Sequence, residues 1–515
     1  MIGRFLVPTV ADLIFLVLLV AWATGSLAPR LLDDAGIGWH IRDGQQILQT
    51  HAVPHSDPFS VSTSGKAWYA WEWLYDILAA SLHAYFGLNG LVFLTAAIIA
   101  ATFALTLSGT LADGAKLPVS VVLVVLAIAA SSIHFFARPH VLSWLFSLIW
   151  FRVLDSYESG TRGKAWIWWL PLLTLIWVNV HGGFLAGFVL LALYLAAGTI
   201  GYLVSRSQQQ KRAISARLKR LGLVTALSIA ATLANPYGYR LHVHIYRYLS
   251  DRFLMNHIEE FQSPNFHGMP QKCFAVLLLF TIAAMASARG KPRASHLLVV
   301  IFAVCSALYA SRNLPVSSIL LTLVIAPLLS QEISEVSTSA RVSPWLHRAL
   351  GRYESFASRM TRVEMQSCRH LWPIVGLLLG LWVAAQGGYL GSRQIMNAHF
   401  RESRFPVHAV NAVAASEVAE PIFAPDYWGG YLIYRLYPRV RVLVDDRHDL
   451  YGDEFFKNYL MIILVQPEWK RELDDTHVNR VLVPSESSLA NIMKLSPQWK
   501  IVYADDTAVL FTKQN

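Results

Sequence analysis

Side chains that can carry out acid–base chemistry gather in one short stretch near the N-terminus. The sequence LLDDAGIGWHIRDG, residues 31–44, follows an apolar segment and places Asp33 and Asp34 side by side, with His40 and Arg42 a few positions later. A carboxylate can take a proton from a hydroxyl group, and an arginine can hold a phosphate. The stretch therefore has residue types suited to group transfer, although a carboxylate pair after an apolar helix is also an ordinary start for a solvated loop.

Similar residues recur between later apolar segments. Each one alone has a structural alternative, such as an arginine that extends toward lipid headgroups or a histidine that binds a carbonyl at a helix end. Their joint placement is the functional signal, because ionisable groups at a membrane are costly and rare unless they are used. The recurring polar residues are Glu72 in EWL, Arg138 and His140 in ARPH, Asn179 and His181 in NVHGG, His257, Glu259, Glu260 and His267 in HIEEFQSPNFH, and Arg312 and Asn313 in SRN.

The composition indicates a polytopic membrane protein. Of 515 residues, 55% are hydrophobic and only 15% are charged, against about 25% charged in soluble domains, and the mean hydropathy is +0.42. Many apolar runs approach the roughly 20 residues that span a bilayer. The first run is interpreted as an uncleaved helix rather than a signal peptide. The predicted spans are 10–28, 89–111, 118–135, 140–156, 165–180, 183–204, 220–236, 273–289, 296–311, 314–331 and 371–390.

The segment 72–87, EWLYDILAASLHAYFG, decides the predicted topology. It is apolar on one face but short and partly charged, which favours a helix in the membrane interface. The basic connectors ARLKR at 216–220, GKPR at 290–293 and six arginines from Arg341 to Arg369 then fall on one side. The positive-inside rule makes that side cytoplasmic. The N-terminus is accordingly predicted inside, and the first outer loop, 29–88, and the C-terminus outside.

Residues 391–515 differ in composition from the membrane domain, 1–390. Short apolar strands alternate there with amphipathic helices, which predicts a small α/β domain with a mixed sheet. The predicted strands are PIFAP, RVLVDD, RVLVPS and WKIVYA, and the predicted helices are WGGYLIYRLY, DEFFKNYLMIIL and SSLANIMKL.

Charge and cysteine usage exclude two other classes of protein. The net charge is +10, but the basic residues lie in short connectors, as topology signals do, so no nucleic-acid partner is expected. Cys273, Cys305 and Cys368 lie in or beside apolar segments without metal-like spacing, so neither a disulfide framework nor a zinc site is expected. The sequence also has no P-loop, Rossmann fingerprint, HExxH motif or nucleophile elbow in a context that would support its function.

The predicted topology brings the candidate residues to the outer face, where a pocket of acids, arginines and histidines suits transfer of a group from a lipid phosphate. A carboxylate would serve the acceptor hydroxyl as general base, and an arginine or a divalent cation would offset the charge of the departing phosphate. Soluble nucleotide-sugars do not occur outside the cytoplasm, so a lipid-linked donor is expected.

Several motifs resemble those of one family. DAGIGWHIRDG, PHSDPFS and EWL are similar to the first outer loop of bacterial GT-C-type glycosyltransferases, near the protein mannosyltransferases and the lipopolysaccharide sugar transferases that use polyprenyl-phosphate donors. ARPH, WVNVHGGF, NPYG with IEEFQSP, and DYWGGYLIYRLYP with VDDR resemble that group too. The resemblance covers most of the chain. It implies an α-helical polytopic GT-C-like fold with about eleven transmembrane helices, outer interfacial helices and a small C-terminal α/β domain.

The resemblance also implies roles for individual residues. Asp34 matches the acidic residue of the first outer loop that acts as base or metal ligand, with Asp33 as its substitute and Glu72 or Glu260 as a second acid. Arg138 and Arg312 match arginines that hold the donor phosphate. His40, His140, Asn179 and His181 complete the expected substrate-binding set. Because the acids do not form an Asp-x-Asp pair, a divalent cation such as Mg or Mn at Asp34 remains open.

The implied function is transfer of a sugar from a polyprenyl-phosphate-linked donor to a glycan or lipid acceptor, at the periplasmic face of the bacterial inner (plasma) membrane and among its lipids. A non-enzymatic transporter or assembly protein that binds lipid-linked carriers is one alternative. A polymerase or ligase of lipid-linked glycans is another, although its loop would be a modest one, residues 237–272. In the tail motif, Tyr427 and Trp428 form either a sugar-stacking platform or, with the two glycines, a helix packed tightly on a strand.

Overall fold

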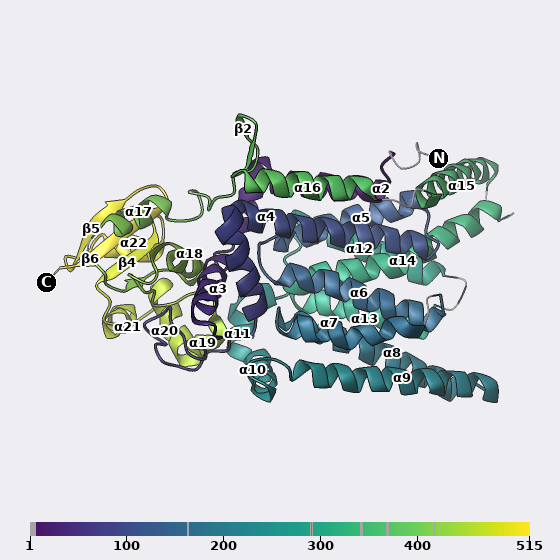
Figure 1. Ribbon diagram of the computed structural model, residues 1–515, viewed down its shortest axis with the longest axis horizontal. Coiled ribbons are helices and arrows are strands. Elements are labelled where there is room, and N and C mark those ends of the chain that lie inside the picture. The colour runs from purple at the N-terminus through teal and green to yellow at the C-terminus, as the bar shows by residue number, and fades with distance from the viewer. Residues whose placement is uncertain are drawn as a thin grey trace.

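Most of the chain forms a bundle of helices that run side by side, with a smaller domain at one end (Figure 1). The computed structural model describes residues 7–161, 164–288, 290, 292–339, 343–366, 370–416 and 418–514. MIGR, Lys291, Arg341, Cys368 and Arg369 lie outside the described residues, so the interpretations placed on them are not addressed by the structure.

Each of the predicted spans coincides with a helix of the bundle. Among the described residues, five helices are long and apolar enough to cross a membrane, or up to seven if each of two bent helix pairs is one span. The chain is therefore a multi-pass membrane protein. The bundle helices are α2 (Val10–Ala23), α4 (Trp73–Ala112), α5 (Leu117–Ser131), α6 (His140–Ser159), α7 (Trp169–Val178), α8 (Leu185–Val204), α9 (Gln208–Thr232), α12 (Met269–Ser287), α13 (Ala294–Tyr309), α14 (Leu314–Thr338) and α16 (Leu371–Ala385).

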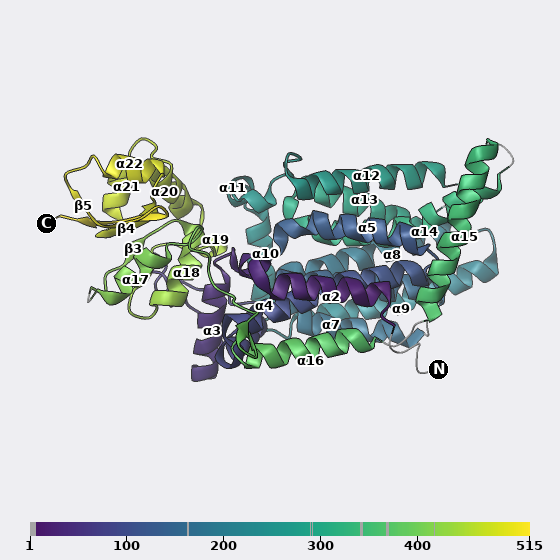
Figure 2. The same cartoon turned by 90° about the horizontal axis from the view of Figure 1, so that it is seen from above.

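Polar contacts at one end of the bundle fix where the helix α2 begins. Thr9 and Asp12 form a capping box at the start of α2, which satisfies amide groups that have no partner within the helix. The Glu364 carboxylate accepts the next two amides, those of Val10 and Ala11, at 2.9 and 3.1 Å. Glu364 belongs to α15 (Pro344–Gln366), which crosses the end of the bundle opposite the C-terminal domain (Figure 2).

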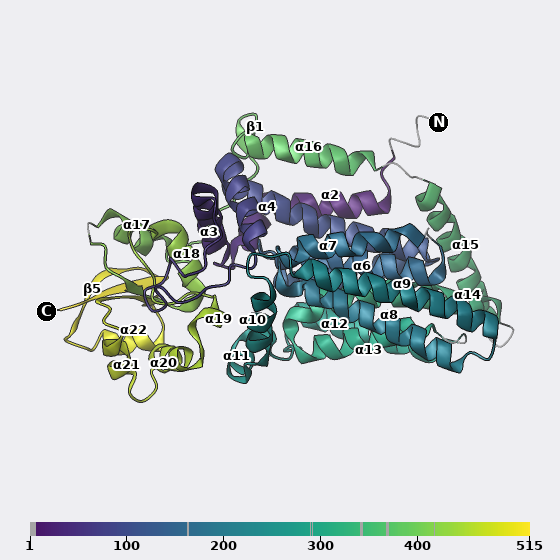
Figure 3. The same cartoon turned by 60° about the horizontal axis from the view of Figure 1, so that its bottom comes forward.

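The other end of the bundle carries the shorter elements. Two of them, α10 and α11, lie between the bundle and the C-terminal domain (Figure 3). Gly87, with φ +60° and ψ −155°, interrupts α4, so the part before Gly87 is a separate helical piece that begins directly after Glu72. The shorter elements at this end are η1 (Gly25–Leu32), α3 (Ile37–Thr50), η2 (Ser132–His134), η4 (Gly182–Phe184), α10 (Tyr239–Ser250), α11 (Arg252–His257), η5 (Glu259–Phe261) and η6 (Ser311–Asn313). One further short element, η3 (Lys164–Trp168), links α6 and α7 at the opposite end of the bundle.

The C-terminal domain has a four-stranded mixed sheet in the order β3-β4-β6-β5. The β3–β4 pair is parallel and the other two pairs are antiparallel. The mixed sheet was predicted, but β6 was not. The strands are β3 (Ile422–Phe423), β4 (Arg480–Pro484), β5 (Trp499–Ala504) and β6 (Ala508–Lys513). The helices are α17 (Val407–Ala415), α18 (Asp426–Leu436), α19 (His448–Tyr451), α20 (Asp453–Ile463), α21 (Trp469–Asp475) and α22 (Ser488–Met493). A hairpin of β1 (Tyr389–Leu390) and β2 (Arg393–Gln394) precedes them.

The prediction of a strand over RVLVDD is wrong. Within it only Val442 pairs, through isolated parallel bridges to Ile422 and to Ser60 of the first outer loop. Beyond Val442 the segment does not continue as a strand: Asp445 is bound by Arg447 at 2.6 Å, and Asp446 reaches into the membrane domain, where it pairs with Arg138. The segment thus connects the two domains instead of extending the sheet.

Candidate active site at the junction of the two domains

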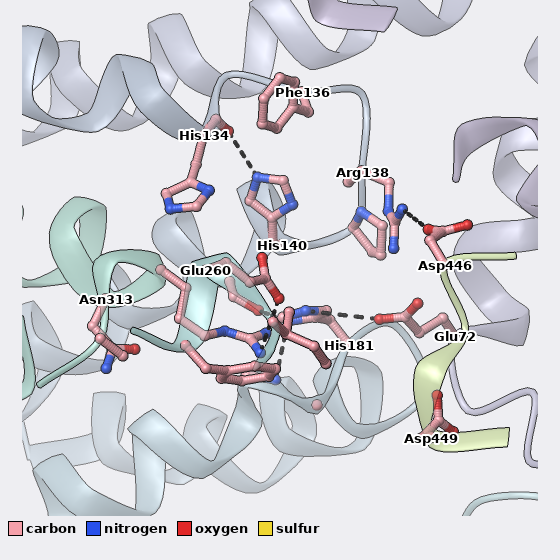
Figure 4. A pocket seen from close by; sticks show the side chains of 18 of the residues that line it. Glu72, His134, Phe136, Arg138, His140, His181, Glu260, Asn313, Asp446 and Asp449 are labelled. Carbon is pink, nitrogen blue, oxygen red and sulfur yellow. Dashed lines mark hydrogen bonds and ion pairs between the residues drawn. The ribbon is translucent and has the colours of Figure 1, made fainter. Parts of the chain in front are cut away.

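A cavity of about 940 Å³ lies where the bundle, the first outer loop and the C-terminal domain meet (Figure 4). Its walls come from segments far apart in the sequence, as the placement of the polar residues predicted. His40 and Asn179 are not among the residues that line it. The predicted site residues that do line it are Asp33, Asp34, Glu72, Arg138, His140, His181, Glu260 and Arg312.

Arg138 joins two carboxylates at the cavity wall. Its Nη1 donates to Asp34 Oδ1 and to Asp446 Oδ2, each at 2.7 Å. The ARPH turn is held against η1 by the Ala137 amide, which donates to the Leu31 carbonyl at 2.7 Å. Gly36 leaves room for the guanidinium, because a Cβ there would lie 1.6 Å from Arg138 Nη1. The arrangement places one positive charge between two carboxylates, and an incoming anion can replace one of these carboxylates at the guanidinium.

Glu72 lies between two histidines. Its Oε2 is 3.7 Å from His40 Nε2, and its Oε1 is 3.7 Å from His181 Nε2 (Figure 4). Burial raises the pKa of Glu72 to about 7 and lowers the pKa of both histidines well below the usual value. At neutral pH both imidazoles are therefore uncharged, and Glu72 can take or give a proton, which is the property of a general base or acid.

His181 presents a hydrogen toward Glu72. Its Nδ1 accepts from the Gly183 amide at 3.0 Å, so in the neutral ring the proton is on Nε2, the nitrogen that faces the carboxylate. Ser143 Oγ lies 2.8 Å from the same Nδ1. A Cβ on Gly183 would lie 2.7 Å from that nitrogen, so this glycine of NVHGG permits the close approach and does more than allow a turn.

The structure places His40 and Asn179 behind the cavity wall. His40 is fully buried, and its Nδ1 lies 2.5 Å from Asp76 Oδ1. Asn179 Oδ1 accepts from Trp73 Nε1 at 2.8 Å, and its amide group donates to the Ala234 carbonyl at 2.9 Å. Asn179 thus ties the helical piece after Glu72 to neighbouring chain segments, and both side chains support the site from outside the cavity.

Arg312 and Glu260 form the opposite wall, and His140 lies near Glu260. Arg312 Nη1 is 3.3 Å from Glu260 Oε1, and its guanidinium lies over the Phe261 ring, 4.4 Å from the centroid. His140 Nε2 donates to the His134 carbonyl at 2.8 Å (Figure 4), which is the carbonyl-binding alternative. The wall therefore offers a second arginine and a second acid to the cavity.

Asp33 and Asp34 have different surroundings although they are adjacent. Both oxygens of Asp33 accept from Arg401, at 2.7 and 2.5 Å, and Arg404 donates to the Asp33 carbonyl at 2.8 Å. Asp33 therefore anchors the segment that leads into the C-terminal domain. The Asp34 side chain is 34% exposed, so of the two it is Asp34 that is available to a bound molecule.

The tail motif DYWGGYLIYRLYP forms α18, which packs on both domains. A Cβ on Gly429 would lie 2.5 Å from Asp445 Cα, and a Cβ on Gly430 would lie 2.3 Å from the Ala35 carbonyl oxygen. Trp428 is buried and donates to the Arg404 carbonyl at 2.8 Å. The helix is thus tightly packed, as in the second alternative, but against loop segments and not on a strand. Only Tyr427, which lines the cavity, is left for the stacking platform.

The arrangement of the acids does not fit a divalent cation. Among the described residues, three or more His, Cys, Asp or Glu side chains never converge as a metal site. Asp34 Oδ1 already accepts from Arg138 and from the Gly36 amide, at 2.7 and 2.9 Å. Arginine here supplies the positive charge for which a metal was considered.

Sequence reasoning missed Asp43 and Asp76, and it left Asp446 open between lining a pocket and making a local salt bridge. Asp446 is in the motif VDDR, whose position across the cavity depends on how the C-terminal domain docks. Asp43 and Asp76 lie on facing helices, and a signal was present: Glu72 and Asp76 are four residues apart, and His40 and Asp43 are three apart, so each pair shares one helix face.

No family model and no curated protein matches the sequence. The apo oligosaccharyltransferase of Archaeoglobus fulgidus is similar in structure, with a TM-score of 0.55 and 12% identity over 94% of this chain and 69% of that chain. AglB of the same organism, in complex with an inhibitory peptide and a dolichol-phosphate, has a TM-score of 0.54 and 12% identity over 100% of this chain and 74% of that one.

ArnT from Cupriavidus metallidurans, bound to undecaprenyl phosphate, is similar at a TM-score of 0.48, with 13% identity over 98% of this chain and 96% of that chain. The archaeal alignments cover almost the whole chain. The chain therefore has the GT-C-like fold that its motifs predicted: a polytopic helical membrane domain followed by a small C-terminal sheet domain.

Proposed function

We propose that the protein is a glycosyltransferase that moves a sugar from a polyprenyl-phosphate-linked donor to a hydroxyl group of a glycan or lipid acceptor. The observation that carries this proposal is the cavity in which Arg138 lies between Asp34 and Asp446 and faces a second acid, Glu72. Such a cavity offers a positive charge for a phosphate and carboxylates for a hydroxyl proton.

The donor phosphate would bind at the arginines. Arg138 would exchange one of its two carboxylates for the phosphate, since a guanidinium binds a phosphate oxygen as it binds a carboxylate oxygen. Arg312 would add a second positive charge from the opposite wall. The fold supports this reading, because AglB of Archaeoglobus fulgidus was solved with a dolichol-phosphate, a lipid phosphate of the same chemical type.

The acceptor hydroxyl would be activated by Asp34, with Glu72 as the second acid. The acceptor oxygen forms a bond to the anomeric carbon while the bond from that carbon to the phosphate oxygen breaks. The hydroxyl proton passes to the carboxylate, and the bonding electrons leave with the polyprenyl phosphate. The arginines stabilise the charge that develops on the phosphate in the transition state.

The predicted topology sets the reaction at the periplasmic face of a bacterial inner membrane. The cavity lies at the end of the bundle that carries the C-terminal domain, whereas α15 and its arginines are at the other end (Figure 2). A cytoplasmic location of the arginine-rich end would follow from the positive-inside rule. A lipid-linked donor would then be the form in which an activated sugar reaches this face.

The experiment is a transfer assay with purified protein in lipid nanodiscs. A polyprenyl-phosphate-linked sugar is added with candidate glycan and lipid acceptors, and both glycosylated acceptor and free polyprenyl phosphate are measured. The proposal expects product with the wild type and a loss of turnover with Asp34→Asn. Binding of the donor without sugar release under every acceptor would favour the transporter or assembly alternative, and chains of added sugar would favour a polymerase or ligase.

A further inference from the structure

A group of buried ionisable side chains lies directly behind Glu72. His40, Asp43 and Asp76 are each fully buried, yet they are next to one another and next to a wall of the cavity. Groups of this kind are costly to bury, and such clusters beside a cavity are more often functional than structural. The mechanism above uses none of the three, so their presence needs its own explanation.

The cluster forms because two helices present matching faces. His40 and Asp43 on α3 face Glu72 and Asp76 on α4. The two helices can approach closely at Gly44, where a Cβ would lie 1.9 Å from the Asp76 carbonyl oxygen. The polar contacts are thus fixed by backbone packing.

The two aspartates are suited to share a proton. Both oxygens of Asp43 and Asp76 Oδ2 are buried and have no hydrogen-bond partner among the described residues, and the two carboxyl groups interact with each other. Two neighbouring carboxyl groups are stabilised when one of them holds a proton that it can donate to the other. Burial raises the pKa of Asp43, with an opposing effect of Asp76 and Arg447. The pair can therefore act as a buried proton store.

His40 connects this store to the cavity. Its Nδ1 lies 2.5 Å from Asp76 Oδ1, and its Nε2 has no hydrogen-bond partner among the described residues although it is fully buried. That nitrogen points at Glu72 Oε2, 3.7 Å away, so a small movement of the Glu72 side chain, which is at the cavity wall, brings the two within hydrogen-bond distance.

We propose that His40, Asp76 and Asp43 form a proton relay that receives, by way of Glu72, the proton which Asp34 takes from the acceptor hydroxyl. This inference rests on the proposed function for the origin of the proton. It assigns His40 and Asp43 as positioning residues, since neither lines the cavity, whereas Asp76 belongs to the cavity wall although its side chain is fully buried. Glu72 and the relay behind it together remove the proton from the site.

The step balances without any further reactant. The hydroxyl proton moves to the Asp34 carboxylate as the acceptor oxygen bonds to the sugar, and it passes from there to the Glu72 carboxylate. Glu72 then passes a proton to His40 Nε2, and His40 Nδ1 passes its proton to Asp76. The Asp43–Asp76 pair ends with two protons, His40 stays neutral, and Glu72 is a carboxylate again. After product release the proton returns along the path to Glu72, which gives it up to water in the cavity, and this restores the starting state.

Charged groups around the relay favour this direction. Arg138 acts on both Glu72 and His40, and it lowers the tendency of each to stay protonated. Positive or partly positive neighbours of His40 also disfavour a lasting imidazolium, so a proton passes through the ring rather than remaining there. The groups that face Glu72 are Arg138, Arg312, His181 and Asp449. Those that face His40 are Arg138, Arg447, His140 and His181. Those that face Asp43 are Arg447 and Asp57.

The test is a pH-jump measurement with time-resolved infrared spectroscopy on the full chain in nanodiscs, without substrate. The wild type is expected to show a protonated carboxyl band at neutral pH that disappears in Asp43→Asn. After an alkaline jump this band should decay at least about tenfold more slowly in His40→Gln and in Glu72→Gln than in the wild type, because both interrupt the path. His83→Gln is the matched control, since His83 on α4 binds the Tyr434 hydroxyl at 2.9 Å and lies outside the cluster.

A band that is unaffected by Asp43→Asn, or that decays at the same rate without His40 and without Glu72, would overturn the relay. A second arm measures sugar transfer: Asp43→Asn should lower kcat and leave KM unchanged. If the wild type transfers no sugar, the proposed function fails, while the infrared arm, which needs no substrate, still decides whether the relay exists.

Discussion

Asp446 Oδ2 accepts a hydrogen bond from Arg138 Nη1 at 2.7 Å, so a residue of the C-terminal domain occupies the arginine that is the best candidate for binding a phosphate. The second Asp446 oxygen accepts from Trp39 Nε1 at 3.1 Å. The C-terminal domain is therefore a part of the site and not only an appendage. A bound phosphate would have to compete with Asp446 or Asp34 for the same guanidinium nitrogen.

Substitution of Arg138 tests the phosphate site. In Arg138→Lys the positive charge remains but the two-sided donor geometry is lost, and kcat/KM for sugar transfer is expected to fall about 10²- to 10³-fold, the range seen when one transition-state donor is removed. Arg435→Lys is the matched control, because Arg435 is on the exposed side of α18, where it binds Asn411. Equal activity of Arg138→Lys and Arg435→Lys would remove Arg138 from the mechanism.

Gly36→Ala probes the same arginine without changing its charge. A Cβ at this position would lie 1.6 Å from Arg138 Nη1 and 2.4 Å from Asp446 Oδ2, so the flexible arginine must move away from its carboxylates. We expect a loss of kcat/KM of about tenfold or more with little change in thermal stability. Gly222→Ala, where a Cβ meets nothing within 4 Å, should behave as the wild type; a similar loss in both would point to a general effect on folding.

Glu72→Gln tests the titration of the second acid. Burial raises the pKa of Glu72 to about 7, and a base acts as the carboxylate, so wild-type kcat should rise as the pH passes upward through that value. The variant should show low activity without this rise. A wild-type pH profile that is flat across neutral pH, or that keeps its rise in Glu72→Gln, would contradict the assignment.

The same substitution is expected to stabilise the fold at alkaline pH. The folded state binds a proton at Glu72 more tightly than the unfolded state does, so wild-type stability falls as the pH rises from the ordinary glutamate pKa to above the raised one. A neutral glutamine avoids this penalty, which amounts to as much as about 3 kcal/mol for a shift of this size. Thermal unfolding in nanodiscs at two pH values measures it, and a stability gain that is equal at acid and alkaline pH would argue against the raised pKa.

Removal of divalent cations should leave turnover unchanged, because Arg138 and Arg312 supply the positive charge at the site. The assay is sugar transfer before and after treatment with EDTA. Loss of activity with EDTA and its recovery on addition of Mg or Mn would instead assign Asp34 to a metal, and would mean that Arg138 releases it during turnover.

The sequence predicts the parts of this site that depend on local pattern. Apolar length identified the helices, basic connectors sorted the loops into two groups, and the polar residues of one group line one cavity: Asp34, Glu72, Arg138, His181 and Arg312 all do so. The start of a helix directly after Glu72 was also predictable from its apolar face.

The parts that escaped prediction depend on contacts between distant segments. Asp446 follows a strand-like run, and only the docking of α18 on the first outer loop, through Gly38 and Gly430, brings it to Arg138. His40 was expected in the cavity, but its position on α3 turns it toward Asp76. Asp33 and Asp34 look equivalent in sequence, and Arg401 distinguishes them.

The most direct test of the account is a structure of the protein in nanodiscs with polyprenyl phosphate, determined by electron cryomicroscopy. We predict that the phosphate lies in the cavity against Arg138, with Asp446 or Asp34 displaced from that guanidinium, and that the lipid chain leaves toward the membrane. A phosphate bound elsewhere, with the contacts of Arg138 to both carboxylates unchanged, would contradict the account.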